Sequence, residues 1–561
     1  MTSPADSAAT FCATLVDEWV GGGVRHAMVS PGSRSTPMAL ALLRHPAIHV
    51  EMFHDERSAS FAGLGAGLAS GVPAVILCSS GTAATHFHAA VVEAHQSNVP
   101  MIVCTADRPA RLHDIAAPQT IDQTKMYGAA VRWFHDPGVP DMSGSHAWRA
   151  LAARALASTL GSRPGPVHLN LPFDEPLYGE ASTLPEARGE RWSVVRRADR
   201  FPDADIDEIA RMLDGRRGVF VAGKGAPASI VDIAEQLGWP VLADSRARVG
   251  RSHRLTVTNF DPILRSGRFV KMHAPDMVVQ VGESPASKVL AQWLKSLSCP
   301  IQHWSDVDMV TDPLHVVGTF LRGDIDGLCR RLAARGFSAS PEWSDGWSVA
   351  QRTAAAAIDA TVSGAWSEVA ASRTASRCIP PGSHVVVSSS MPVRDLEWFG
   401  ALPDDVVVHS NRGANGIDGV VATGLGAAVA TGATTFVLIG DVALLHDASS
   451  LTGMAARGLD VRVVVTNNDG GSIFSFLPQA AQVSAGEFET MYGTPHGTDF
   501  ASLCHAHGIR HETVTDADSL RIAMSHSGPI VIEAPFDRSV NVSAHDAVNA
   551  AVVAALDAVT A

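Results

Sequence analysis

The sequence predicts an α/β protein in which two related doubly wound parallel-sheet domains flank a central α/β domain. The chain of 561 residues is long enough for about three domains of 100–200 residues. Short apolar, β-branched segments alternate with helical patterns along it, which is typical of parallel sheets built from strand–helix–strand units. A small-residue segment near the N-terminus also recurs near the C-terminus, which indicates that the two ends are related.

The recurring segment reads GLGAGLASG at residues 63–71 and GLGAAVATG at residues 424–432, and six of the nine positions are identical. Each copy has the composition of a small-residue helix that packs closely on a sheet. Each leads into a buried-type strand, 74–78 or 435–439, and each strand ends in a glycine-containing turn. Chance convergence of alanine-rich helices is the alternative, but the shared order of helix, strand and turn favours a duplication.

The strands place the domains at residues 1–182, 200–345 and 360–561. A polar stretch at 180–203, which contains proline and arginine, is expected to link the first two domains, and a second boundary is expected near 338–360. The predicted strands are, in chain order, 27–29, 74–78, 101–105, 167–170, 218–222, 240–243, 277–281, 384–387, 406–409, 435–439, 461–466 and 530–533.

The composition argues against several classes of protein. The net charge is −14 without a basic block, so neither nucleic acid nor an anionic membrane is expected as a partner. Seven scattered cysteines without a C-x-x-C pair argue against a disulfide framework or structural zinc and favour a reducing compartment. A signal peptide and an integral membrane segment are not expected, because the sequence contains neither a basic, apolar leader nor a run of about 18 apolar residues. We therefore expect a cytoplasmic enzyme.

Polar residues follow two apolar strands of the last domain. Gly440-Asp441 comes after strand 435–439, and Asn467-Asn468-Asp469-Gly470 comes after strand 461–466. Open α/β sheets bind ligands at these carboxyl ends. An aspartate carboxylate, an asparagine carbonyl and a backbone carbonyl are hard oxygen ligands that suit Mg²⁺ bound together with phosphates. The spacing predicts a metal site at Asp441, Asn468 and Gly470, with Mn²⁺ as the alternative ion; two ordinary turns are the simpler interpretation.

Together with the repeat, this motif resembles that of thiamine diphosphate-dependent enzymes. The resemblance covers all 561 residues, in the order pyrimidine-binding, central and diphosphate-binding domain. The motif of that superfamily is GDG followed by NN, and here Val442 stands at its third position. Several loops narrow the resemblance to the 2-succinyl-5-enolpyruvyl-6-hydroxy-3-cyclohexene-1-carboxylate (SEPHCHC) synthases of menaquinone biosynthesis: SPGSRSTP (30–37), HDERS (54–58), SGT (80–82), DRP (107–109), QTIDQ (119–123) and NRGANGID (411–418).

The resemblance implies that Glu56 is catalytic, because members of the superfamily use a glutamate to hydrogen-bond the aminopyrimidine ring of the cofactor. From its position alone, Glu56 is better explained as a glutamate at a helix N-terminus, where the helix dipole favours a negative charge. Ile417 matches the apolar residue that bends the cofactor. The residues expected to bind the cofactor are Ser80, Gly81, Thr82, Ile417, Gly440, Asp441, Asn468, Gly470, Gly471 and Ser472.

The substrates implied by the resemblance are 2-oxoglutarate and isochorismate. Each carries two carboxylates, and arginine binds a carboxylate through two parallel hydrogen bonds, so a locally basic site is expected in this acidic protein. Taken singly, each arginine is better explained as a solvated surface residue, but the places of the four arginines in family loops after strands favour substrate binding. For Lys288, in the central domain, both interpretations stay open. The expected substrate-binding residues are Arg34, Arg108, Arg394, Arg412 and Lys288, with Ser33, Gln119 and Ser390 as hydrogen-bonding partners and Phe474 and Leu477 as an apolar wall.

The implied activity is that of a transferase. It combines thiamine diphosphate-dependent decarboxylation of 2-oxoglutarate with conjugate (1,4) addition of the resulting succinyl carbanion to isochorismate, giving SEPHCHC and CO₂. The implied assembly is a homodimer or homotetramer, with the cofactor between the first domain of one subunit and the last domain of another. The alternative enzyme is another thiamine diphosphate-dependent 2-oxoacid decarboxylase or carboligase, such as an acetolactate synthase. The alternative without catalysis is a nucleotide sensor or scaffold built on duplicated domains.

Overall fold

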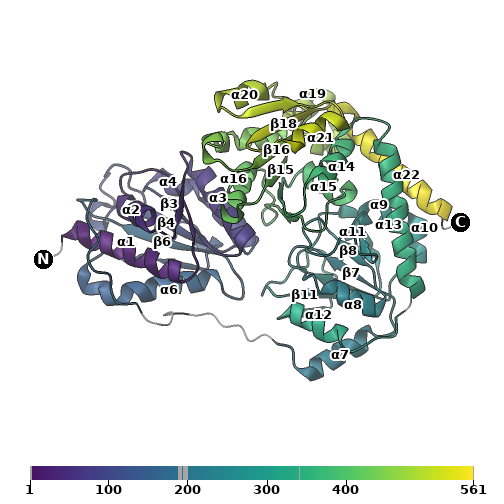
Figure 1. Cartoon of the computed structure of the whole chain (residues 1–561), viewed down its shortest axis with the longest axis horizontal. Coiled ribbons are helices and arrows are strands. Elements are labelled where there is room, and N and C mark those ends of the chain that lie inside the picture. The colour runs from purple at the N-terminus through teal and green to yellow at the C-terminus, as the bar shows by residue number, and fades with distance from the viewer. Residues whose placement is uncertain (1–2, 188–192, 194–199, 340, 560–561) are drawn as a thin grey trace.

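The chain folds into three parallel sheets of six strands each in the computed structural model, which describes residues 3–187, 193, 200–339 and 341–559. Figure 1 shows the first sheet in the purple and blue part of the chain, the second in the teal part, and the third in the green and yellow part. Alternate residues of the strand 74–78 pack on opposite faces of the first sheet, with Ile76 in one apolar cluster and Val75 and Leu77 in the other. Burial on both faces is typical of parallel sheets, and the predicted fold class is confirmed.

The first sheet has the strand order β2-β1-β3-β4-β6-β5. Its strands are β1 (His26–Val29), β2 (His49–Met52), β3 (Ala74–Cys78), β4 (Met101–Asp107), β5 (Trp133–His135) and β6 (Pro166–Pro172). Its helices are α1 (Pro4–Gly21), α2 (Thr36–Arg44), α3 (Glu56–Ser70), α4 (Thr82–His86), α5 (His88–Gln96) and α6 (Trp148–Thr159).

The last sheet has the strand order β14-β13-β15-β16-β18-β17. If β13 is taken as its first strand, this order is the same as that of the first sheet at every position. Its strands are β13 (His384–Val387), β14 (Val407–His409), β15 (Thr435–Gly440), β16 (Val461–Asn467), β17 (Arg510–Thr513) and β18 (Ile530–Pro535). Its helices are α14 (Glu368–Cys378), α15 (Met391–Phe399), α16 (Val420–Thr431), α17 (Asp441–His446), α18 (Gln479–Gln482), α19 (Ala485–Phe488), α20 (Phe500–Ala506), α21 (Ala517–Ser525) and α22 (Asn541–Val559).

The central sheet has a different order, β12-β11-β10-β7-β8-β9, so the chain starts in the middle and adds strands outward on both sides. Its strands are β7 (Gly218–Ala222), β8 (Val241–Ala243), β9 (Thr256–Val257), β10 (Met277–Val281), β11 (Ile301–Ser305) and β12 (Thr319–Arg322). Its helices are α7 (Asp203–Leu213), α8 (Ile230–Leu237), α9 (Phe260–Leu264), α10 (Gly267–Met272), α11 (Lys288–Ser296), α12 (Ile325–Ala333) and α13 (Pro341–Val362).

The two copies of the repeat form α3 and α16, which pack against each other between the first and last domains (Figure 1). A Cβ added at Gly65 would lie 2.0 Å from the backbone oxygen of Thr423, and one added at Gly426 would lie 1.8 Å from that of Ala62. Neither distance leaves room for a side chain. The two helix backbones therefore touch at glycines that occupy matching positions of the repeat.

The preceding pair of matching glycines, Gly63 and Gly424, lets each helix pack closely on its own sheet. A Cβ at Gly63 would lie 2.3 Å from a side-chain atom of Ile76 in β3, and a Cβ at Gly424 would lie 2.4 Å from a side-chain atom of Val437 in β15. The small residues of the repeat thus serve two close contacts, one with a strand and one with the partner helix. The sequence predicted only the contact with the sheet.

The C-terminal helix α22 packs along α13 and also contacts α9 (Figure 1). Residues 538–559 form the one helix in the described ranges that is long and apolar enough, by length and composition, to cross a membrane. One face of α22 is buried within the chain, through His545, Val548, Val552 and Leu556. Only 28% of its 18-residue apolar window is buried, and a single helix that meets this criterion is weak evidence for a membrane span.

All twelve predicted strands occur, with ends that differ by at most two residues. The sequence missed β2, β5, β9, β11, β12 and β17, and all of these except β11 lie at an edge of their sheet. Edge strands are partly exposed, as the pattern of β2 and β17 shows, so they lack the continuous apolar run of a central strand. The linker predicted at 180–203 lies partly outside the described residues.

Candidate active site

A cavity of about 130 Å³ opens at the carboxyl end of the last sheet. Ser390 follows β13, Asp441 follows β15 and Asn468 follows β16, and all three line it. The crevice between β13 and β15 is the switch point of this sheet, where open α/β sheets bind ligands. The predicted site residues in its walls are Ser390, Ile417, Gly440, Asp441, Asn468, Gly470, Gly471, Ser472 and Phe474.

Asp441 is the first residue of α17, and its side chain is buried. Its Oδ2 accepts hydrogen bonds from the backbone N–H groups of Asn468 at 3.2 Å and Gly470 at 2.8 Å. Its Oδ1 accepts one from the N–H of Val442 at 2.8 Å. The carboxylate therefore ties the turn after β16 to the turn after β15, which brings the predicted metal ligands together.

The side-chain oxygen of Asn468 is poised for a ligand. Its nitrogen donates to Oε1 of Glu368 at 3.0 Å, whereas its buried Oδ1 has no hydrogen-bond partner in the described part of the chain. A buried amide oxygen costs free energy when nothing binds it. With the carboxylate of Asp441 and the carbonyl of Gly470, this oxygen makes up the donor set that a hard divalent cation takes, so the residues present fit Mg²⁺.

A buried polar cluster in the wall of the cavity was missed by the sequence analysis. Glu368, at the start of α14, is 3% exposed, and its Oε2 has no partner among the described residues. Burial, with the nearby carboxylate of Asp395, raises the pKa of Glu368 to about 8. Asp395 in turn pairs with His545 of α22 at 2.8 Å. This cluster sets the direction of the Asn468 amide, and its members come from segments too distant in sequence to form a motif.

His496 is a second residue that the sequence analysis missed. Its Nε2 lies 3.2 Å from Oδ2 of Asp441, and its Nδ1 accepts a hydrogen bond from the backbone N–H of Thr498 at 3.0 Å. The bond to Thr498 leaves the proton on Nε2, which donates to Asp441. Outer partners of this kind commonly orient the ligands of a metal site.

Of the ten predicted substrate-binding residues, two, Ser390 and Phe474, line this cavity. Leu477 is 39% exposed beyond Phe474, and Lys288 is exposed at the start of α11. Phe474 does line the cavity, with its ring centre 5.5 Å from that of Tyr492. Of the two residues predicted as an apolar wall, Phe474 therefore lies at the cavity and Leu477 does not.

The predicted residues of the first domain gather at the carboxyl end of the first sheet. Arg108, after β4, donates to Oγ of Ser80 and, at 2.9 Å, to the backbone oxygen of Gln119. Burial, with the nearby guanidinium of Arg34, lowers the pKa of Arg108. Arg34 is buried and pairs with Glu175 at 2.9 Å. The turns at this end also carry Ser33, Gly81 and Thr82.

Glu56 is the first residue of α3 and is half-buried. Its carboxylate lies near Cys78, the last residue of β3, and after burial it is the largest cause of the raised pKa of that thiol. Glu56 therefore stands at the same carboxyl end of the first sheet as the two arginines of this domain.

Among the described residues, the first domain of the same chain contributes none to the cavity of the last domain, because all of the lining residues lie between 368 and 474. The neighbours of Glu56 contact the last domain elsewhere. Asp55 accepts a hydrogen bond from Ser449 at 2.5 Å, and Arg57 donates to the backbone oxygen of His446 at 2.6 Å. These contacts hold the start of α3 against the end of α17 that is opposite to Asp441.

This contact includes a carboxyl group that makes stability depend on pH. Burial raises the pKa of Asp447 to about 6, although Ser450 and the backbone N–H of Ala422 donate to it at 2.7 and 3.0 Å. The folded state holds this proton more tightly than the unfolded chain, whose ordinary value is 3.8. The contribution of Asp447 to stability therefore falls as the pH rises from about 4 to about 6.

We expect the Tm of the protein minus the Tm of Asp447→Asn to decrease across this pH range and to level off above it, because asparagine does not titrate. Thermal unfolding in a series of buffers from about pH 4 to about pH 8 measures both values. A difference that stays constant over the whole series would contradict this assignment.

Arg394 and Arg412 lie at the end of the last sheet that holds the cavity. Arg394, in the first turn of α15, donates to the backbone oxygen of Ser390 at 2.6 Å. Arg412 stands in the loop 411–418, which contributes Ile417 to the cavity wall. Burial, with repulsion from Arg246 and Arg394, lowers the pKa of Arg412. Neither side chain is among the residues that line the cavity, but each lies beside a segment that does, and guanidinium groups bind carboxylates well.

Three family models match the chain in the order of its three sheets. The model "Thiamine pyrophosphate enzyme, N-terminal TPP binding domain" matches residues 10–126. The model "Middle domain of thiamine pyrophosphate" matches residues 192–386, and "Thiamine pyrophosphate enzyme, C-terminal TPP binding domain" matches residues 401–534. Thiamine pyrophosphate is another name for thiamine diphosphate, so these matches confirm the expected cofactor.

Relatives match the chain over nearly its whole length. One from Myxococcus xanthus is 38% identical over 99% of both chains. One from Chloroflexus aurantiacus is 37% identical over 97% of this chain and 96% of its own, and one from Saccharopolyspora erythraea is 36% identical over 97% and 98%. All three carry the same name, and their similarity shows that this chain belongs to the enzyme family of the 2-succinyl-5-enolpyruvyl-6-hydroxy-3-cyclohexene-1-carboxylate synthases.

Proposed function

We propose that the protein decarboxylates 2-oxoglutarate with thiamine diphosphate and adds the succinyl unit in a conjugate (1,4) sense to isochorismate, as a step of menaquinone biosynthesis. The observation that carries this proposal is that Arg394 donates to the backbone of Ser390, a wall residue of the cavity that holds the predicted metal ligands, and that the guanidinium of Arg412 lies near that of Arg394. Both substrates carry two carboxylates, which arginine binds in well-matched pairs. The name of the full-length relatives supports the same product.

The cavity suits a diphosphate with its metal ion. Asp441, Asn468 and the carbonyl of Gly470 would hold Mg²⁺, with Mn²⁺ as the alternative, and Gly440 and Gly471 keep the same walls free of side chains. When bound, thiamine diphosphate supplies the electron sink that allows a 2-oxoacid to lose CO₂. This chain supplies the binding groups and the apolar surface that excludes water.

The residues of the chain would orient the substrates and move a proton. Glu56 would share its carboxyl proton with the aminopyrimidine of the cofactor, as a general acid and base. Arg394 and Arg412 would hold substrate carboxylates on one side of the site, and Arg34 and Arg108 would hold them on the other. Fixing both substrates in one orientation removes a large part of the entropic barrier to their reaction.

An assay with purified protein, thiamine diphosphate and Mg²⁺ separates this reaction from that of an acetolactate synthase. We expect isochorismate absorbance to fall only when 2-oxoglutarate is present. We expect kcat/KM for CO₂ release from pyruvate to be lower by about 100-fold or more, because pyruvate leaves one set of cationic donors unpaired. Release of CO₂ from pyruvate without any reaction of 2-oxoglutarate would retain the cofactor and overturn the substrates.

We further propose that each active site is shared between two copies of the chain, in a homodimer or in a tetramer of two such dimers. The cavity is walled only by residues 368–474 of its own chain, while the first domain carries Glu56, Arg34 and Arg108 at a different sheet end. A second copy that brings these three residues to the cavity would complete the site. A two-fold axis then completes the second site in the same way.

Mixing two inactive variants tests this sharing. At subsaturating cofactor, Glu56→Gln and Asn468→Ala would each be nearly inactive alone, but a mixed dimer would have one site with both defects and one site with neither. After subunit exchange we expect about a quarter of the full activity, because half of the dimers are mixed and half of their sites are intact. No recovery, in a mixture whose exchange is confirmed by tagged subunits, would place both residues in a site within one chain.

We also propose domain boundaries at 1–182, 200–345 and 360–561 and a location in the cytoplasm. The three sheets lie within residues 26–172, 218–322 and 384–535, which supports the boundaries. The seven cysteines are all free, which supports a reducing compartment.

A further inference from the structure

A buried carboxylate of the first domain holds the loop that carries Arg412. Glu93, in α5, is 3% exposed. Its Oε1 accepts a hydrogen bond from the backbone N–H of Gly413 and its Oε2 accepts one from that of Ala414, both at 2.7 Å. The hydroxyl of Ser97 also donates to Oε1, at 2.5 Å. One carboxylate thus joins two successive amides of the last domain to a helix of the first.

The loop is fixed on both sides of Arg412. Before it, Oγ of Ser389 donates to the backbone oxygen of Asn411 at 2.6 Å, and after it Glu93 holds the next two amides. A Cβ added at Gly413 would lie 2.7 Å from a side-chain atom of α5, so the loop reaches the helix only through a glycine. The guanidinium of Arg412 donates no hydrogen bond within the described ranges and is free for a ligand.

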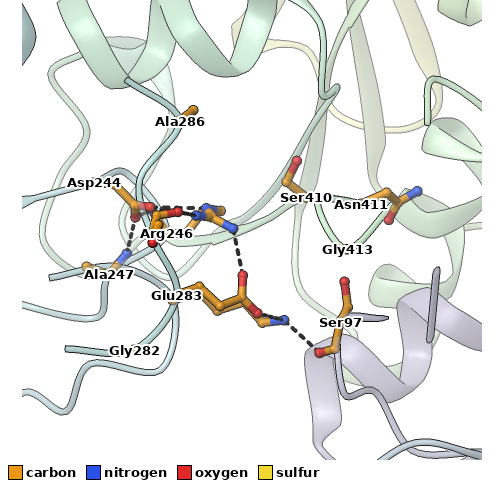
Figure 2. Close-up of polar contacts among 12 residues, drawn as sticks. Ser97, Asp244, Arg246, Ala247, Gly282, Glu283, Ala286, Ser410, Asn411 and Gly413 are labelled. Carbon is orange, nitrogen blue, oxygen red and sulfur yellow. Dashed lines mark hydrogen bonds and ion pairs between the residues drawn. The ribbon is translucent and has the colours of Figure 1, made fainter. Parts of the chain in front are cut away.

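Ion pairs of the central domain hold the residue that follows α5, Ser97 (Figure 2). Lys224 donates to the backbone oxygen of Ser97 at 3.1 Å and pairs with Glu283 at 3.1 Å. Glu283 also pairs with the buried Arg246 at 2.9 Å. Figure 2 shows Ser97 to the right of Glu283 and below the segment that carries Asn411 and Gly413. The end of α5 is therefore held in position, and it offers a rigid base to the loop.

We propose that Glu93 is a positioning residue for Arg412: its carboxylate fixes the backbone after Arg412 and so sets where the guanidinium receives a substrate carboxylate. This inference rests on the substrate-binding role proposed for Arg412. A carboxylate suits the task because it only accepts hydrogen bonds and has an oxygen for each amide, whereas a glutamine would turn its own NH₂ toward one of them. The competing explanation is that Glu93 only joins the domains.

A double-mutant cycle distinguishes the two explanations. Glu93→Gln and Arg412→Lys would be made singly and together, and KM for each of the two acids and kcat would be measured for the full-length protein with cofactor. We expect both variants to raise KM for the same acid, by about 5- to 10-fold for Glu93→Gln. Their combined effect should fall short of the product of the single effects by about fivefold, because both act through one guanidinium.

The matched control is a second double-mutant cycle that pairs Glu93→Gln with Arg34→Lys. Arg34 is a cation of the first domain that Glu93 does not contact. Effects of Glu93→Gln and Arg34→Lys should multiply, as they do for independent sites. If Glu93→Gln folds poorly, Gly413→Ala pushes the loop off α5 with Glu93 intact and should give the same rise in KM. Hydrogen exchange should be faster at the amides of Gly413 and Ala414 in both variants.

The outcomes separate failure of this inference from failure of the proposed function. If Arg412→Lys leaves KM unchanged for both acids, the substrate-binding role of Arg412 is wrong, and this inference fails with it. If Arg412→Lys raises KM but Glu93→Gln and Gly413→Ala do not, or if their effects multiply with those of Arg412→Lys, then Glu93 only joins the domains.

Discussion

Alanine in place of Asn468 is expected to weaken binding of thiamine diphosphate with Mg²⁺ by about 100-fold. The substitution removes the one buried amide oxygen of the cavity that has no partner among the described residues. Loss of even an outer partner of a metal ligand costs about 10- to 100-fold in metal affinity, so loss of a ligand should reach at least the upper end of that range. Titration of the protein with cofactor at fixed Mg²⁺, followed by calorimetry or tryptophan fluorescence, measures the change.

Asn467 provides the matched control for this experiment. Its side chain points away from the cavity and donates to Glu533 at 2.6 Å, just as Asn468 donates to Glu368 at 3.0 Å. Asn467→Ala therefore removes a comparable hydrogen bond to a carboxylate, although Glu533 keeps its contact with His511 at 2.8 Å. It keeps every predicted ligand, so its cofactor affinity should stay within about twofold. Equal losses in the two variants would mean that the turn is damaged and that Asn468 is not a ligand.

Glutamine in place of Glu56 is expected to lower kcat by about 100- to 10 000-fold, because an amide cannot take and return the proton of a general acid and base. Cofactor affinity should change little, since the predicted diphosphate and metal ligands lie in the other domain. Steady-state rates at saturating substrates give kcat, and the cofactor titration gives the affinity independently. A fall in affinity that accounts for the whole loss of rate would remove the proton-transfer role.

Glu51 provides the control for Glu56. It lies on β2 in the same domain, and its carboxylate pairs with Arg457 at 3.0 Å and with His49 at 2.7 Å. Glu51→Gln weakens the contact between the first and last domains, so it should lower the Tm and leave kcat unchanged. A loss of kcat as large as that of Glu56→Gln would show that this contact, and not the proton on Glu56, limits the reaction.

The architecture and much of the cavity could be predicted because their signals are local. A buried parallel strand is a short apolar run, and the polar residue that follows it must lie at the carboxyl edge of the sheet. This reasoning was enough to place Asp441 and Asn468, and the structure brings both into one cavity. The family resemblance added Ser390, Ile417 and Phe474, which line the same cavity. It also added Arg394, Arg412, Lys288 and Leu477, which do not line it.

The supporting residues could not be predicted because folding brings them together from distant segments. Glu368 and Asn468 are 100 residues apart, His496 and Asp441 are 55 apart, and Glu93 and Gly413 are 320 apart. Each partner looks ordinary in its own segment. Glu93, for instance, is one glutamate in a helix, and only its burial beside two backbone amides reveals its role.

The packing of α3 on α16 has a consequence for synthesis of the protein. Every residue of α3 from Ser58 to Gly67 is buried in the finished fold, and the helix has no charged side chain after Arg57. Its cover, α16, begins at Val420, which the ribosome adds 350 residues after Ser70. At a synthesis rate of about 5–20 residues per second, about 20–70 s pass before α16 is made. During this interval one apolar face of α3 is exposed to water, so we expect the nascent chain to be prone to aggregation and to bind chaperones.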